Sequence, residues 1–208
     1  MLKELFERYP CLTDCEQEIK LATQRLISCY ESKNKVLTCG NGGSCADADH
    51  IVGELMKGFL KKRPLSSTKK QTMKNSYDGL DDDILNSLQE GLPALSLCSL
   101  TALNTAFCND VNPELIYAQA VLGIATKGDV LICLSTSGNA KNVCAAAKVA
   151  KALGVYVIGL TGKNGGELST VADICIKVAE TETFKVQELH LPVYHYLCAA
   201  TERYFFES

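Results

Sequence analysis

Residues 35–54 read Lys-Val-Leu-Thr-Cys-Gly-Asn-Gly-Gly-Ser-Cys-Ala-Asp-Ala-Asp-His-Ile-Val-Gly-Glu. This stretch predicts a short apolar strand over 36–39, a glycine-rich turn over 40–44 and a helix after the turn. Glycine allows positive φ and a close approach of backbone to ligand, and Ser44 is expected to cap the helix, whose first N–H groups then favour an anion. The stretch therefore predicts the first strand, turn and helix of an α/β domain.

The predicted helix carries His50 and Glu54, which are four residues apart and therefore share one face. They form either a ligand or acid/base pair, or an ordinary solvated surface pair. The chain contains three histidines, and the other two, His190 and His195, lie together near the C-terminus. Histidine this sparse and this clustered favours a site over a surface pair.

The segment with the other two histidines reads Gln-Glu-Leu-His-Leu-Pro-Val-Tyr-His over residues 187–195. On a helix Gln187 and His195 share a face about two turns apart, whereas His190 points elsewhere. Pro192 is expected in the first turn of this helix, where its missing N–H does no damage. Taken alone, His195 is more typical of a buried core histidine than of a ligand.

Composition limits the classes of function. The 208 residues suffice for one domain with a substantial core, and the net charge of -3 argues against a nucleic-acid partner. The N-terminus mixes both charge signs without an apolar core region, and no apolar run approaches the length of a membrane span. We therefore expect a cytoplasmic protein that binds neither nucleic acid nor membrane.

Cysteine usage favours reduced thiols. The chain has eleven cysteines, an odd number, and several lie in apolar strand-like runs, where a thiol behaves as a small hydrophobic group. No Cys-x-x-Cys pair is present, which argues against a zinc site built from cysteine.

An extra helix is predicted before the first strand. Residues 13–16 read Thr-Asp-Cys-Glu, a capping-box pattern, and Ile19, Ala22, Leu26 and Tyr30 then recur at helical spacing. This apolar stripe is expected to pack on the sheet or on a second copy of the chain. Because the later helices already cover both faces of the sheet, a second copy is the expected cover.

Residues 57–92 interrupt the pattern of strands and helices. Their first half is basic, their second half is acidic, and apolar residues are sparse. A solvated excursion that is partly helical near 84–88 is the expected structure, and a lid or a subunit contact is the alternative.

After residue 92, apolar strand-like runs alternate with helical patterns. Strands are predicted at 93–97, 129–134, 155–160 and 174–178, and helices at 113–124 and 139–153. Strands that are apolar on both faces predict a parallel sheet with helices on both sides: a five-stranded, Rossmann-like or flavodoxin-like α/β fold. Ligands bind at the carboxyl ends of such strands. Three polar loops are predicted there: Asn41–Ser44, Asn109-Asp110 and Ser135–Asn139.

The last of these loops has three consecutive hydroxyl residues, Ser135, Thr136 and Ser137, followed by Gly138 and a predicted helix. Hydroxyl groups and N-terminal helix amides that converge on one point form a cradle for a phosphate. A simple capped helix explains the same residues equally well.

Together these motifs resemble the phosphoheptose isomerase branch of the sugar isomerase (SIS) family. The resemblance covers roughly residues 33–205 and implies a single SIS domain over 1–208, with residues 1–33 used for oligomerisation. It implies an aldose–ketose isomerase that acts on sedoheptulose 7-phosphate as a homotetramer. The motifs are Gly40-Asn41-Gly42-Gly43-Ser44, His50-xxx-Glu54, Asn109-Asp110, Ser135-Thr136-Ser137-Gly138-Asn139, Leu160-Thr161-Gly162-Lys163-Asn164-Gly165-Gly166 and Gln187-Glu188 with His195.

The resemblance also implies roles for individual residues. Aldose–ketose exchange through an enediol needs a base and a partner for proton transfer at oxygen, and Glu54 and His195 suit these roles. Zinc is implied on His50, Glu54, Gln187 and His195, where it would orient hydroxyls and stabilise an oxyanion. The sugar phosphate is implied to contact Asn41, Gly42, Gly43, Ser44, Glu54, Asn109, Asp110, Ser135, Thr136, Ser137 and Gln187.

Three features depart from the family pattern. Ala140 stands where relatives often have serine, Phe184 stands where better-known enzymes have aspartate, and the 57–92 excursion is longer than a plain connection. A non-catalytic SIS protein, of the kind that binds a replication initiator or senses a sugar phosphate, is the alternative. The presence of both Glu54 and His195 favours the enzyme.

Overall fold

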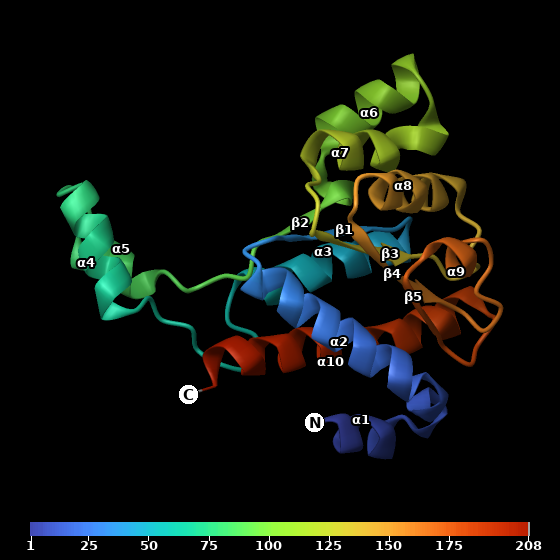
Figure 1. Cartoon of the computed structure of the whole chain (residues 1–208), viewed down its shortest axis with the longest axis horizontal. Helices are drawn as coiled ribbons and strands as arrows, with labels where there is room; N and C mark the ends of the chain where they lie inside the picture. Colours follow the sequence, from blue (N-terminus) through green and yellow to red (C-terminus); the bar gives the residue numbers. More distant parts are fainter. Residues whose placement is uncertain (208) are drawn as a thin grey trace.

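Five parallel strands form one sheet at the centre of the computed structural model, which describes residues 1–207 (Figure 1). The strand order is β2-β1-β3-β4-β5, which confirms the predicted flavodoxin-like sheet. In such an order the chain reverses direction across the sheet at β1 and β3, and ligands bind at that switch point. The strands are β1 (Val36–Cys39), β2 (Ala94–Ser96), β3 (Val130–Leu134), β4 (Tyr156–Thr161) and β5 (Ile174–Lys177).

Helices cover both faces of the sheet (Figure 1). The helices α2 (Glu16–Glu31), α3 (Gly43–Met56) and α10 (Thr183–Phe206) pack on one face, and α7 (Ile116–Ile124) and α8 (Lys141–Ala152) pack on the other. The remaining helices are α1 (Leu2–Arg8), α4 (Ser67–Ser76), α5 (Asp82–Ser87), α6 (Thr101–Asp110) and α9 (Leu168–Val171).

Alternate side chains of each strand enter opposite cores, as the period of two in a strand requires. Val36 and Ile132 belong to the core beneath α2, α3 and α10, whereas Leu37, Leu131 and Cys133 belong to the core beneath α7 and α8. All five of these side chains are buried. Both faces of the sheet are therefore covered, as parallel sheets require.

The apolar stripe of α2 is covered by the chain itself. Ile19, Ala22, Leu26 and Tyr30 are all buried, in the same core as α10 and β5. The expectation that a second copy covers this stripe was therefore wrong. The C-terminal segment forms α10, a helix of 24 residues. It lies beside α2 on one face of the sheet, and that face has room for both helices (Figure 1).

Two predicted helix starts were also wrong. A 3-10 turn occupies Pro10–Cys15, in which the Thr13 hydroxyl donates to the Pro10 carbonyl at 2.7 Å, and α2 begins at Glu16 without a side-chain cap. Pro192 lies inside α10 rather than in its first turn. Pro192 is buried, so packing of the apolar face offsets the lost backbone hydrogen bond.

The charged excursion forms a helical hairpin of α4 and α5 that projects away from the sheet (Figure 1). Exposed ion pairs join its basic and acidic halves, among them Lys74 with Asp82 and Lys69 with Glu90. Leu85 is the one residue of the two helices that is buried. A solvated, partly helical excursion is confirmed, with α4 as a helix that the sequence pattern did not predict.

His190 is fully buried on the inner side of α10, and within residues 1–207 neither ring nitrogen has a hydrogen-bond partner. Burial lowers the pKa of His190 from 6.5 to about 4, so the folded protein holds this ring neutral. The unfolded chain takes up a proton near pH 6.5, and the folded chain does so only near pH 4.

This difference makes stability depend on pH. The contribution of His190 is fully present above pH 6.5 and is lost as the pH falls towards 4. We expect this one group to lower the free energy of unfolding by up to about 3 kcal/mol over that range. The variant His190→Leu should show a flatter decline when urea unfolding is compared at pH 7 and pH 5. Parallel declines in the two proteins would contradict the prediction.

Candidate functional site

The turn after β1 reaches α3 two residues earlier than predicted. Gly42 precedes the helix with φ of 55°, α3 begins at Gly43, and Ser44 is a buried residue of the first turn rather than the cap. At Gly40 a Cβ atom would lie 2.5 Å from the Ser44 carbonyl oxygen. The capping role predicted for Ser44 is therefore wrong, because two glycines turn the chain into the helix before it.

Side chains fasten this turn to the neighbouring elements. The amides of Asn41 and Asn142 exchange two hydrogen bonds of 2.8 and 2.9 Å, which join the turn to the start of α8. The Tyr117 hydroxyl donates to the Gly40 carbonyl oxygen at 2.6 Å. The loop ends of β1 and β3 are thus held together at the switch point.

The hydroxyl loop after β3 is braced by its own backbone. Ser137 Oγ accepts the Asn139 N–H at 3.1 Å, and the buried Ser135 Oγ accepts the Ala140 N–H at 3.4 Å. The helix α8 begins at Lys141, slightly later than predicted. An accepting hydroxyl still has its own O–H to donate, so the loop combines a structural role with donors for an anion.

Asn109 and Asp110 lie elsewhere. They form the last turn of α6, are exposed, and are joined by a hydrogen bond of 2.8 Å from the Asn109 amide to the Asp110 carboxylate. Figure 1 shows α6 on the outer side of α7, away from α3 and α10. The prediction of a loop at a strand end was wrong here, because the chain after β2 enters a 3-10 turn (Leu97–Ser99) and then α6.

The helices α3 and α10 bring His50, Glu54 and His195 together. His50 Nε2 lies 3.1 Å from Glu54 Oε1, and the ring centroid of His195 lies 5.0 Å from that of His50. Gln187 reaches the start of α3, where a Cβ atom on Gly43 would lie 2.6 Å from its amide nitrogen. Residues almost 150 positions apart therefore meet as the spacing on each helix predicts.

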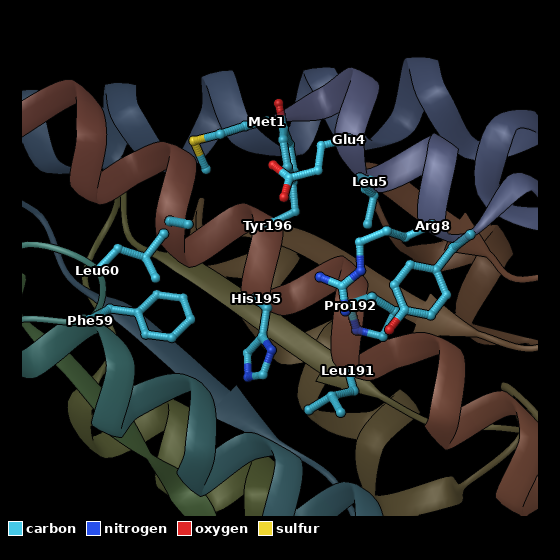
Figure 2. A pocket seen from close by; sticks show the side chains of 12 residues that line it. Met1, Glu4, Leu5, Arg8, Phe59, Leu60, Leu191, Pro192, His195 and Tyr196 are labelled. Atoms are coloured by element: carbon cyan, nitrogen blue, oxygen red, sulfur yellow. The ribbon is translucent and has the colours of Figure 1, made fainter.

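His195 projects from α10 towards α3, beside the ring of Phe59 (Figure 2). Burial, together with the neighbouring His50, lowers the pKa of His195. A neutral His195 at pH 7 is able to accept a proton. Its ring lines a cavity of about 480 Å³ that lies between α10 and α1 and includes Arg8 and Leu60 (Figure 2).

The two imidazoles and the carboxylate of the donor set suit zinc in their chemistry, since imidazole nitrogens and carboxylate oxygens are ordinary zinc ligands. His195 Nε2 is buried and has no hydrogen-bond partner among the residues that the structure describes. Over the same residues, no three His, Cys, Asp or Glu side chains are arranged around one point. Zinc therefore stays a prediction.

A buried ion pair beside this site was missed by the sequence analysis. Arg63 Nε donates to Glu202 Oε1 at 2.8 Å, and both side chains are almost completely buried. Burial alone would raise the pKa of Glu202, but hydrogen bonds from the Phe59 and Leu60 amides and from Arg63 hold it below its ordinary value. One feature of the sequence could have drawn attention to this pair: Arg63 is the single arginine in a lysine-rich run.

This ion pair fixes the end of α3 against α10. Arg63 also donates to the Leu55 and Glu54 carbonyl oxygens, at 2.7 and 3.2 Å, which are among the last carbonyls of the helix. Glu202 lies two turns beyond His195 on α10. The same contact therefore positions Glu54, Phe59 and His195.

Comparison with known proteins identifies the family. The SIS domain model matches residues 102–200. A phosphoheptose isomerase of Nitratiruptor is 35% identical over 207 residues, covering 98% of this chain and 97% of the relative. A phosphoheptose isomerase of Rhodospirillum rubrum is 37% identical over 191 residues, covering 92% and 88%. The chain belongs to the phosphoheptose isomerase family.

A solved phosphoheptose isomerase from Francisella tularensis has the same fold, with a TM-score of 0.74 and 29% identity, covering 90% of this chain and 86% of that one. As in the sequence, no helix within residues 1–207 is long and apolar enough to cross a membrane. The phosphoheptose isomerase fold of this chain therefore comprises the sheet, its two helical layers and the α3–α10 pair described above.

Breaking the buried ion pair is expected to lower the stability of the protein. Arg63→Met leaves the Glu202 carboxylate buried without its partner and should lower the free energy of unfolding by about 3–5 kcal/mol. The double variant with Glu202→Leu should be less destabilised than Arg63→Met, because the unpaired charge is then removed as well.

Arg203→Met is a matched control, since Arg203 is the next residue on α10 and pairs with Glu207 at the surface. Its effect in urea unfolding should stay within about 0.5 kcal/mol. Equal effects of Arg63→Met and Arg203→Met would contradict the assignment of a buried, structurally important pair.

Proposed function

We propose that this protein is an aldose–ketose isomerase that converts sedoheptulose 7-phosphate into D-glycero-D-manno-heptose 7-phosphate. The observation that carries the proposal is the meeting of Glu54 and His50 on α3 with His195 on α10. Relatives that match this chain over nearly its full length are named phosphoheptose isomerases, which supports the same reaction.

The reaction moves a proton from C1 of the ketose to C2 of the aldose through an enediol(ate). Glu54 takes the proton from C1 and returns it to C2, which is general-base and then general-acid catalysis by one carboxylate. At the same time a proton passes from the C1 hydroxyl to the C2 oxygen. His195, held neutral by burial and by its neighbour His50, is suited to carry this second proton.

Zinc is proposed as the resident metal, held by His50, Glu54, Gln187 and His195. When bound, it would supply a Lewis acid that stabilises the negative oxygen of the enediolate. The two oxygens of Glu54 have different surroundings, because Oε1 faces His50 whereas Oε2 lies 3.4 Å from Lys57 Nζ. One carboxylate can therefore contact an ion and a substrate hydrogen through different atoms.

The phosphate is proposed to bind at Ser135, Thr136 and Ser137, near the N-terminus of α8. This loop follows β3 and lies next to the turn that opens α3, so one sugar phosphate can contact both. We also propose a cytoplasmic homotetramer. That assembly rests on the family resemblance, because the stripe of α2 is already covered within the chain.

The variant Glu54→Gln tests the proposed base. It keeps the side-chain volume and removes the basic carboxylate, so turnover of sedoheptulose 7-phosphate should fall by about two to four powers of ten. Thermal unfolding of the metal-free protein should change little, and zinc content measured on the same sample distinguishes loss of the base from loss of the metal. Wild-type turnover in this variant would exclude Glu54 as the base.

The variant Lys57→Met is the control, because Lys57 is an exposed partner of the same carboxylate. It should reduce turnover far less than Glu54→Gln. A loss as large as that of Glu54→Gln would instead mean that the charge at residue 57 carries the reaction.

A further inference from the structure

Two residues outside the predicted site form a chain of hydrogen bonds that ends on His50. The Tyr194 hydroxyl lies 3.0 Å from His50 Nδ1 and 3.1 Å from Asp47 Oδ1. Tyr194 is 1% exposed, and its ring packs edge-on against the rings of both His50 and His195. These hydrogen bonds therefore run from Asp47 on α3 to Tyr194 on α10 and back to His50 on α3, at the centre of the site.

The directions of these hydrogen bonds follow from the groups involved. An ionised Asp47 can only accept, so the Tyr194 O–H donates to it. The Tyr194 oxygen then offers lone pairs to His50, and His50 Nδ1 must carry the hydrogen that it donates. In its neutral form, the ring of His50 is thereby fixed in the tautomer whose Nε2 bears a lone pair.

That lone pair faces another acceptor. His50 Nε2 lies 3.1 Å from Glu54 Oε1, and a carboxylate oxygen has no hydrogen to share. Two acceptors at this distance repel each other unless a cation is bound beside both of them. The cation is either a metal ion or a second proton on His50.

We propose that Asp47 and Tyr194 are positioning residues that fix the ring orientation and tautomer of His50, so that its Nε2 presents a lone pair to a divalent metal ion beside Glu54. The proposal deepens the proposed function and rests on its metal assignment. Outer hydrogen-bond partners of this kind set the orientation and basicity of metal-ligating histidines. Asp47 acts only through Tyr194.

The first test removes one oxygen atom. Tyr194→Phe keeps the ring packing, and its zinc affinity, measured by competition with a chelator, should fall about 10–100-fold. Tyr204→Phe is the matched control: Tyr204 lies on the same helix and also donates to a carboxylate, that of Glu31, but it is exposed and remote from the site. Its zinc affinity should equal that of the wild type.

The second test reads the position of the hydrogen on His50 and does not depend on turnover. In the zinc-loaded wild type, ¹⁵N spectra of labelled histidine should show His50 with hydrogen on Nδ1 and none on Nε2. Asp47→Asn should shift His50 towards the opposite tautomer, because the new amide can donate to Tyr194 and release its O–H for His50. This variant also serves if Tyr194→Phe does not fold.

Coupling between the two residues completes the test. Adding Asp47→Asn to Tyr194→Phe should lower zinc affinity no further. Unchanged affinity in Tyr194→Phe, or zinc-loaded wild type with hydrogen on Nε2 of His50, would overturn the proposal even if the protein is an active isomerase. A wild type that turns over sugar phosphate but binds no zinc would overturn it together with the metal assignment, and leave the isomerase assignment standing.

Discussion

The buried ion pair between Arg63 and Glu202 is the contact on which the site depends. Taking two charges out of water is costly, and here the cost is offset because the Glu202 carboxylate accepts from Arg63 and from three backbone amides. Arg63 in turn satisfies two carbonyl oxygens at the end of α3. The pair therefore sets the distance between α3 and α10, and that distance decides whether Glu54 meets His195.

The strand order of the sheet also determines which elements meet at the site. Its strand order brings the ends of β1 and β3 together, so the turn before α3 and the hydroxyl loop before α8 lie side by side. The α10 helix crosses the same face of the sheet as α3 and places His195 against His50. The end of the site at the hydroxyl loop is thus suited to an anion, and the end at His195 is suited to proton transfer. The turn around Gly42 and Gly43 lies between these two ends.

Local patterns in the sequence predicted much of this arrangement. Buried parallel strands read as continuous apolar runs, so all five were found, and the spacing of His50 and Glu54 placed both on one helix face. Contacts between distant segments were not predictable. Arg63 and Tyr194 act through partners 139 and 144 residues away, which leave no local pattern. The predictions of what covers the α2 stripe and of where Asn109 lies were wrong for the same reason, because packing rather than periodicity decides both.

In the proposed mechanism, Glu54 carries a proton between two carbons of the sugar phosphate. Turnover of sedoheptulose 7-phosphate in deuterium oxide, followed by NMR of the product, tests it directly. His50 and Glu54 are in part exposed to solvent, so a proton on the base exchanges before it is returned. Deuterium is therefore expected at C2 of the aldose phosphate. Complete retention of hydrogen from C1 over many turnovers would mean a direct hydride shift and would exclude Glu54 as the carrier of the proton.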